Sequence, residues 1–172
     1  MIKNLDTERL MLRPFSLKDA NDLYEMNLDP LVVRYTGDGA FNSIEEAKEL
    51  IRHYDQYKKY GMGRLAVFRK SDGSFLGWCG LKYQTDDKIV DIGYRFYRKF
   101  WGFGYATEAA KICLADGFYR LQLKTIYGHV HEENDASGRV LKKCGLKFVK
   151  NITYDKQPAK LYRIRKDEFK IL

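Results

Sequence analysis

Cysteine is scarce in this sequence, and long apolar runs are missing. Its 172 residues include three cysteines, Cys79, Cys113 and Cys144, which lie far apart and form no CxxC pair. Such sparse cysteine argues against a zinc site and is typical of a reducing compartment. No apolar stretch approaches the ~18 residues that span a bilayer, and the first residues lack a signal-peptide core. We therefore expect a cytoplasmic protein with no metal cofactor and no membrane partner.

Acidic residues are outnumbered, which bears on the partners of the protein. The chain has 23 Asp and Glu against 31 Lys and Arg, so its formal net charge is +8. This excess favours anionic partners such as a nucleotide cofactor, an acidic peptide or RNA. The chain lacks an RNP-like aromatic motif and an Arg-rich tract, so specific RNA recognition is not indicated. Its length suggests a single domain spanning residues 1–172.

The stretch from Asp91 to Ala109 carries the strongest local pattern. Residues 88–97 alternate in character, which predicts a strand with Val90 and Ile92 on one face. From about residue 105 to 120 the apolar residues follow helical spacing. Gly102 and Gly104 stand between the two elements. A glycine loop between a strand and a helix is typical of an anion-binding turn, because the loop amides and the positive helix end point to one place.

Two common phosphate loops do not fit this turn. A Walker A loop requires GxxxxGK[ST], which is absent, and the dinucleotide fingerprint GxGxxG would need a glycine where Thr107 stands. The spacing Lys99-x-x-Gly102-x-Gly104 instead resembles the [Q/R]xxGx[G/A] pyrophosphate loop of the GNAT acetyltransferases. The runs DIGYRFYRKFWGFGYATEA and HEENDASGRVLKKCGLKF are similar to motifs of the RimJ/RimL-like branch of that superfamily. The chain departs from those motifs without losing a loop amide, at Lys99, Gly138 and Leu146.

The remaining periodicities predict an α+β protein. Strands are expected over residues 9–15, 65–69, 75–83, 88–97, 124–131, 146–154 and 161–166, with hairpin turns at 71–74 and around Gln157-Pro158. Helices are expected from Ser16 to about Pro30, from Ser43 to the glycines at 61 and 63, and over 105–120 and 135–144. The resemblance implies a GNAT-like mixed sheet, mostly antiparallel, with a central splayed parallel strand pair and flanking helices.

The resemblance also implies acetyl-CoA as the cosubstrate and assigns residues to it. Backbone amides would cradle the pyrophosphate, namely those of Phe100, Trp101, Gly102, Phe103, Gly104, Tyr105, Ala106 and Thr107. Lys99 would add charge there or stay solvated, and the strand edge at Tyr94, Arg95 and Phe96 would pair with the pantetheine arm. Asn134 would contact the arm, although it is also a good N-cap for the following helix. Lys142 and Lys143 would meet the ribose phosphate or form a solvated helix face.

Two residues are candidates for proton transfer. The resemblance makes Asp91 the candidate general base and Ser137 the candidate general acid for the leaving thiolate. A carboxylate with its usual pKa of ~3.9 is a weak base toward an ammonium, so burial or a water relay would have to assist. His129 and His131 are rival bases. An ordinary solvated Asp91, and a water in place of Ser137, are the simpler alternatives. A covalent route through Cys113 is disfavoured, since that residue falls on the apolar helix stripe.

The function expected from these observations is N-acetylation. We predict direct transfer of an acetyl group from acetyl-CoA to a primary amine in a ternary complex, with a protein N-terminus, a polyamine or a small-molecule amine as the acceptor. A non-catalytic acyl-CoA- or RNA-binding module on the same fold is the alternative. An enzyme for a longer acyl-CoA is a further one, if there is room beside Gly93. The sequence leaves open a homodimer and an association with the ribosome or RNA.

Overall fold

The computed structural model describes residues 2–170 of the protein. In this part of the chain, eight strands form one sheet in the order β1-β2-β3-β4-β5-β6-β8-β7, antiparallel except at β5 and β6. The strands are β1 (Leu5–Asp6), β2 (Leu10–Pro14), β3 (Arg64–Arg69), β4 (Phe75–Gln84), β5 (Ile89–Phe96), β6 (Thr125–His131), β7 (Lys147–Tyr154) and β8 (Gln157–Arg165). The predicted mixed, mostly antiparallel sheet is confirmed.

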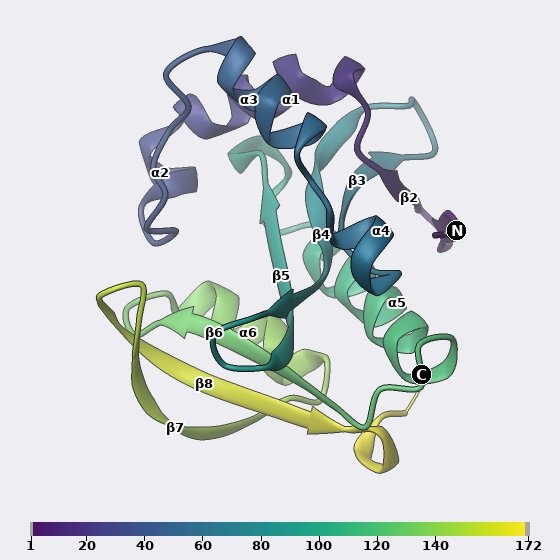
Figure 1. Cartoon of the computed structure of the whole chain (residues 1–172), viewed down its shortest axis with the longest axis vertical. Helices are drawn as coiled ribbons and strands as arrows, with labels where there is room; N and C mark the ends of the chain where they lie inside the picture. Colours follow the sequence, from purple (N-terminus) through teal and green to yellow (C-terminus); the bar gives the residue numbers. More distant parts are fainter. Residues whose placement is uncertain (1, 171–172) are drawn as a thin grey trace.

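The parallel pair β5 and β6 separates along most of its length. Within the described residues, Asp91 and Tyr127 are the one pair in register between these strands. Past Asp91, β5 remains paired with β4 as far as Phe96, while β6 remains paired with β8. The sheet therefore opens toward the C-terminal ends of both strands, as Figure 1 shows. This opening confirms the predicted splay.

Helix α5 (Tyr105–Tyr119) packs against β4 and β5, and α6 (Asp135–Lys143) packs against β6 and α5. The predicted apolar stripe of α5 packs on the core: Ala106 is partly buried, and the other members, Ala109, Ala110, Cys113, Leu114, Gly117 and Phe118, are buried. Gly117 allows close approach to the sheet, because a Cβ there would lie 2.7 Å from Leu81 Cδ1. None of the helices in the described part of the chain has the length and apolarity that a bilayer crossing demands.

Three N-terminal helices form a separate layer beside the C-terminal end of β5, drawn at the top of Figure 1. They are α1 (Ala20–Leu28), α2 (Pro30–Val33) and α3 (Ile44–Arg52). Pro30 follows the end of α1 at Leu28, as the sequence predicts, and it also begins α2. Proline is favoured at this first position, and the Asp29 side chain caps the helix by accepting from the Leu31 amide at 3.0 Å.

The second predicted helix starts as expected but is wrong in its extent. The Ser43 side chain caps α3, yet the helix ends at Arg52 and a separate helix, α4, spans Gln56–Tyr60. The break turns two tyrosines inward: the Tyr54 hydroxyl accepts from the Arg64 amide at 2.7 Å, and the Tyr57 hydroxyl donates to the Arg64 carbonyl. These tertiary hydrogen bonds outweigh the helical spacing of the sequence.

The last hairpin turn is also displaced from its predicted position. Gln157-Pro158 belongs to β8, and the turn is formed by Asp155 and Lys156, whose φ angles are 48° and 62°. The prediction followed the proline, but Pro158 lies opposite Thr153 in the β7–β8 ladder. The turn position matters because Asp155 faces the pocket described next.

Candidate functional site

The chain between β5 and α5 forms an open glycine loop. A 3-10 turn (Arg98–Phe100) leads into Gly102 and Gly104, which have φ angles of 83° and 81°. Glycine adopts positive φ without the strain that other residues would carry. Nothing lies within 4 Å of a Cβ placed on Gly102, and the neighbouring Phe103 side chain is 59% exposed. A ligand can therefore approach this backbone closely.

The loop presents unpaired amides at the start of a long helix. Among the described residues, the amides from Gly102 to Thr107 donate to no protein acceptor. The amides of Phe100 and Trp101, which the sequence placed in the same cradle, already donate to Tyr97 and Arg98 at 2.9 and 3.0 Å. The donors free for an anion thus begin at Gly102, beside the positive end of the α5 dipole. This set has the chemistry that a phosphate or pyrophosphate requires.

Two side chains shape the approach to the loop. The Trp101 indole donates to the Phe96 carbonyl at 2.9 Å, so the backbone edge of β5 is closed at Phe96. Lys99 Nζ lies over the rings of Tyr97 and Phe100, at 4.9 and 5.2 Å from their centroids. Lys99 therefore holds its charge against an aromatic surface next to the loop.

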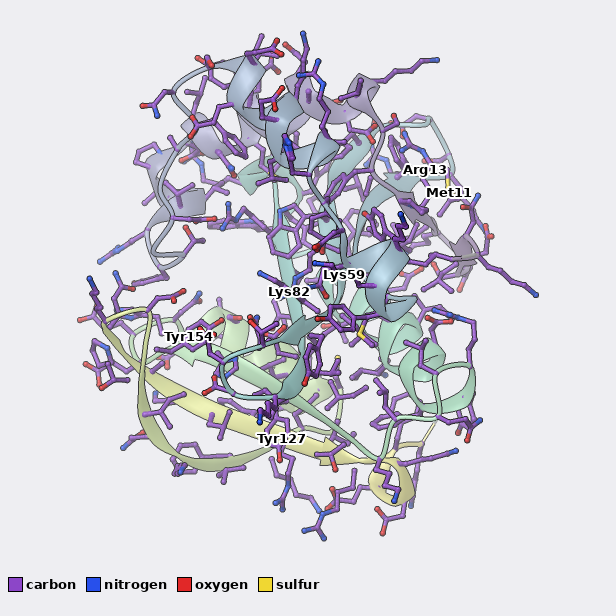
Figure 2. All side chains as sticks on the ribbon, in the orientation of Figure 1. Met11, Arg13, Lys59, Lys82, Tyr127 and Tyr154 are labelled. Carbon is purple, nitrogen blue, oxygen red and sulfur yellow. The ribbon has the colours of Figure 1, made fainter. Side chains whose placement is uncertain are left out.

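A cavity of about 360 Å³ lies where β5 and β6 separate, and we call it the central pocket. It brings together most of the predicted active-site side chains, including Asp91, Tyr94, Arg95, Asn134 and Ser137 and the rivals His129 and His131. Leu23, Asn27 and Leu50 of the N-terminal helices form another wall, and Lys82 of β4 and Tyr154 of β7 also line it (Figure 2). The N-terminal helices thus contribute side chains to the wall of the pocket.

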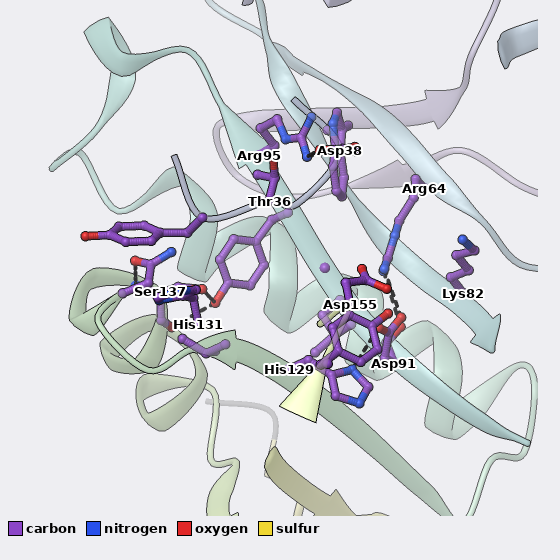
Figure 3. Close-up of a pocket in the computed structure, with 18 of the residues that line it drawn as sticks. Thr36, Asp38, Arg64, Lys82, Asp91, Arg95, His129, His131, Ser137 and Asp155 are labelled. Atoms are coloured by element: carbon purple, nitrogen blue, oxygen red, sulfur yellow. Dashed lines mark hydrogen bonds and ion pairs between the residues drawn. The ribbon is translucent and has the colours of Figure 1, made fainter. Parts of the chain in front are cut away.

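Asp91 lies at one end of this pocket in a dense polar cluster. Its carboxylate pairs with the Arg64 guanidinium at 2.8 Å and accepts from Gln84 Nε2 at 3.1 Å. His129 Nδ1 is 3.3 Å from the second carboxylate oxygen, and the His129 ring stacks on Tyr154 at 4.1 Å. Figure 3 shows Arg64, Asp91 and His129 converging from three strands. Asp91 is therefore a buried, fully engaged carboxylate and not a solvated one.

The electrostatics of this cluster limit what Asp91 does as a base. Burial by itself would raise the pKa of Asp91, but the Arg64 charge and the hydrogen bonds from His129 and Gln84 outweigh it and lower the pKa to about 2. A carboxylate with so low a pKa takes a proton from an ammonium poorly. Its assignment as the general base stays a prediction. The geometry favours a related role, in which Asp91 accepts from Nδ1–H of His129 and leaves Nε2 as the basic atom.

Ser137 lies at the other end of the pocket, paired with Tyr94. The Ser137 hydroxyl donates to the Tyr94 hydroxyl at 3.0 Å, and the Tyr94 hydroxyl donates to the Ser137 carbonyl at 2.9 Å. Burial, the largest influence, raises the pKa of Tyr94, so this phenol stays protonated. Asn134 is confirmed as the N-cap of α6, because its side chain accepts from the Ser137 amide at 3.1 Å. Two hydroxyl groups thus share this end of the pocket.

Arg95 forms the upper wall of the pocket as drawn in Figure 3. Its guanidinium donates to Asn27 at 3.1 Å and to Asp38 at 3.0 Å, and it lies over the Trp78 ring. The side chain is therefore committed to the α1 layer. Any contact of Arg95 with a ligand in the gap beside β5 would come from its backbone.

Lys143 stands apart from the pocket, in the last turn of α6. The adjacent Cys144 thiol lies 3.8 Å from the Thr107 carbonyl, so this end of α6 is close to the first turn of α5. The assignment of Lys143 to a ribose phosphate stays a prediction, and this proximity is compatible with it.

Sequence patterns missed three residues of the Asp91 cluster: Arg64, Gln84 and Tyr154. Each comes from a different strand, and their convergence depends on the register of β3, β4 and β7. The sequence held one signal for this cluster, which is Arg64, an arginine at the start of a largely apolar strand. No group of three or more His, Cys, Asp or Glu side chains within residues 2–170 is arranged to hold a metal ion.

Comparisons with known proteins identify the family of this chain. The family model described as an acetyltransferase (GNAT) domain matches residues 9–147. An uncharacterized N-acetyltransferase of Bacillus licheniformis, p20, is 31% identical over 142 residues, covering 81% of this chain and 80% of that protein. A GNAT-family acetyltransferase from Bacillus anthracis superposes with a TM-score of 0.83 at 26% identity, covering 96% of this chain and all of that one.

One structural neighbour bears on the predicted branch of the superfamily. RimJ of Mycobacterium smegmatis, solved in complex with a CoA disulfide, has a TM-score of 0.84 at 20% identity, covering 97% of this chain and 89% of that one. At this identity the likeness shows the fold alone. The RimJ/RimL-like assignment therefore stays a prediction based on the motifs.

Proposed function

The chain belongs to the GNAT family of acetyltransferases and is an acetyl-CoA-dependent N-acetyltransferase, and we propose that it acetylates a primary amine bound in the central pocket by direct transfer. One observation carries this proposal. The splayed edge of β5 leads from the open glycine loop to a pocket lined by both candidate proton-transfer groups. The motifs support placing the enzyme in the RimJ/RimL-like branch.

The residues of the loop and strand fit the two recognisable parts of acetyl-CoA. The free amides from Gly102 to Thr107 would hold the pyrophosphate, with Lys99 adding charge nearby. The backbone of Tyr94 and Arg95, in the stretch where β5 lacks β6 as a partner, would pair with the pantetheine arm. Acetyl-CoA supplies the activated acetyl group when bound. The chain supplies the cradle, the alignment and the proton transfers.

The base end of the pocket would deprotonate the acceptor. The reaction forms a C–N bond, breaks a C–S bond and requires the amine to lose a proton before or during attack. Asp91 would fix the proton on Nδ1 of His129, so that Nε2 accepts the proton of the amine directly or through a water. Arg64 keeps Asp91 ionised, and stacking on Tyr154 fixes the plane of the His129 ring. The predicted Asp91 base thereby becomes an Asp91–His129 pair.

The Ser137–Tyr94 pair would supply the proton to the leaving thiolate. The two hydroxyls form a donor chain, in which Ser137 Oγ donates to the Tyr94 hydroxyl and the Tyr94 hydroxyl donates to the Ser137 carbonyl. The serine hydroxyl can therefore turn toward the sulfur while Tyr94 keeps its own acceptor. Figure 3 shows Ser137 at the far side of the pocket from Asp91 and His129. The two proton transfers would therefore occur on opposite sides of the reacting carbonyl.

The size and charge of the central pocket limit the acceptor. A volume of about 360 Å³ lies in the usual range for small-molecule sites. Its wall carries carboxylates at Asp38 and Asp155 and cations at Arg64 and Lys82, so no single charge dominates. A protein N-terminus, a polyamine and a small amine all satisfy these limits. All three cysteines are free and buried, which supports a cytoplasmic setting.

A turnover screen tests the proposed function. Purified protein is incubated with acetyl-CoA and each class of amine, and the free thiol released is measured, with propionyl- and butyryl-CoA in parallel. We expect amine-dependent thiol release that is fastest with acetyl-CoA. Binding of CoA without turnover on any class would favour the non-catalytic module. Salt-sensitive RNA binding without CoA binding would refute the proposal.

A further inference from the structure

Residues Thr7 and Arg9, between β1 and β2, lie against the first turn of α5 and bind its acidic residue. The Thr7 hydroxyl donates to Glu108 Oε1 at 2.6 Å, and the Arg9 amide donates to the same oxygen at 3.0 Å. The Arg9 guanidinium donates to Glu108 Oε2 at 2.7 Å. Both carboxylate oxygens thus accept from a segment 99 to 101 positions away in the sequence.

The same guanidinium reaches the glycine loop. Arg9 Nη1 donates to the Phe103 carbonyl at 3.0 Å, and the guanidinium lies 4.6 Å from the centroid of the Tyr105 ring. Arg9 Nη2 is 3.5 Å from the position of a Cβ on Gly104. The Phe103 side chain is 59% exposed, and its ring stacks on Tyr105 with 5.9 Å between the ring centroids. Arg9 therefore fixes a carbonyl in the middle of an otherwise open segment.

The charge of Glu108 explains why a cation is needed at this point. The Glu108 amide donates to the Gly104 carbonyl at 3.1 Å, so the carboxylate belongs to the helical turn that follows the free loop amides. An uncompensated carboxylate there would repel a phosphate bound to those amides. Arg9 cancels this charge while it holds Phe103.

We propose that Thr7, Arg9 and Glu108 form a clasp that sets the glycine loop in its cofactor-binding conformation, with Arg9 as a positioning residue. The inference rests on the proposed function, because it requires that the loop bind the pyrophosphate of CoA. It assigns a shared role to two sequence segments that the transfer reaction does not use directly.

The test compares Arg9→Met with a matched control, Arg52→Met. Both arginine side chains are 43% exposed and paired with glutamates, but Arg52 lies on α3 and has no contact with the loop among the described residues. We expect Arg9→Met to raise the CoA dissociation constant and the KM for acetyl-CoA about tenfold, the scale of a charged hydrogen bond. The kcat at saturating acetyl-CoA should stay within about twofold, whereas Arg52→Met should change neither constant.

Two further variants separate the clasp from a general loss of stability. Arg9→Lys keeps the charge but loses the planar guanidinium that bonds two acceptors at once, so its CoA affinity should lie between those of Arg9→Met and the wild type. Adding Glu108→Gln to Arg9→Met removes the unpaired carboxylate, so affinity should rise above that of Arg9→Met alone. If Arg9→Met does not fold, Thr7→Val takes its place, with a rise of about threefold expected in the CoA dissociation constant.

Calorimetric titration with CoA decides between the outcomes. No CoA binding by the wild-type protein would defeat the proposed function itself. Wild-type binding with equal affinity in Arg9→Met and Arg52→Met would overturn the clasp alone. A fall in kcat without a change in the KM for acetyl-CoA would also overturn it, because a loop-positioning residue acts on cofactor binding.

Discussion

The buried pair of Asp91 and Arg64 allows a stability prediction to be worked from its geometry. The two side chains are 6% and 14% exposed and 2.8 Å apart, so water screens them little. The pKa of Asp91 is lowered from 3.8 to about 2 although burial alone would raise it. Each pKa unit corresponds to about 1.4 kcal/mol, so ionised Asp91 stabilises the folded state by about 2 kcal/mol relative to a carboxyl group with an ordinary pKa.

The sign of the pH dependence follows from the direction of this shift. The folded-state pKa lies below the unfolded-state pKa, so the stabilisation is complete above about pH 5 and is lost as the pH falls from about 4 to about 2. Asp91→Asn removes this dependence. At pH 7 it also leaves Arg64 buried without its counter-charge, which typically costs about 3–5 kcal/mol. The variant should therefore be less stable at neutral pH and less sensitive to acid.

Urea unfolding at several pH values between 2.5 and 7 measures both effects. Asp55→Asn is the control, since it removes a carboxylate from an exposed pair with Lys59, where screening leaves little interaction to lose. Arg64→Met combined with Asp91→Asn should recover much of the neutral-pH loss, because neither charge is then left alone. Equal stability of Asp91→Asn and wild type at pH 7, with parallel acid dependence, would refute the reasoning.

Three further predictions concern the cofactor and the chemistry. Gly102→Val should abolish the stabilisation by CoA, which for the wild type is ~2.7 kcal/mol at a hundred times the dissociation constant. The control is Gly73→Val, at a hairpin glycine with a φ of 70° and equally open space, which should retain the CoA-dependent stabilisation in thermal melts. His129→Gln should lower turnover ~10²-fold near pH 7, and its turnover should recover as the pH rises. His131→Gln should leave turnover unchanged, so equal effects of the two substitutions in steady-state kinetics would exclude His129 as the base. Ser137→Ala should lower kcat roughly tenfold without changing CoA affinity, since water or Tyr94 can replace the hydroxyl; an unchanged kcat would make the serine structural.

Local patterns were sufficient for the elements that build the glycine loop. The alternation of residues 88–97, the helical spacing after Tyr105 and the cap at Asn134 each depend on neighbours in sequence, and the structure confirms all three. The register and splay of β5 and β6 depend on pairing across the sheet, which periodicity does not encode. The splay was predicted through the family resemblance alone.

The environment of Asp91 could not be read in the same way. Its partners Arg64, Gln84 and His129 lie between 7 and 38 positions away, on three different strands. The motifs made Asp91 a candidate base, but they did not indicate that an arginine neutralises it. The break between α3 and α4 is a related case, since the hydroxyls of Tyr54 and Tyr57 find backbone partners that become available only after β3 is in place.

The single register pair between Asp91 and Tyr127 is the point about which the two parts of the sheet can change their angle. The strands β1–β5 form one hydrogen-bonded block and β6–β8 form another, and the backbone ladder joins them at this point alone within the described residues. An extended ligand bound in the gap between β5 and β6 would connect the two blocks at positions farther from Asp91. Because Asp91 belongs to this register pair, its backbone pairing with Tyr127 sets both the angle between the blocks and the position of its carboxylate. Side chains farther from Asp91 can thus be exchanged to suit a different amine, while the Asp91 end, where deprotonation of the amine is proposed, keeps its geometry.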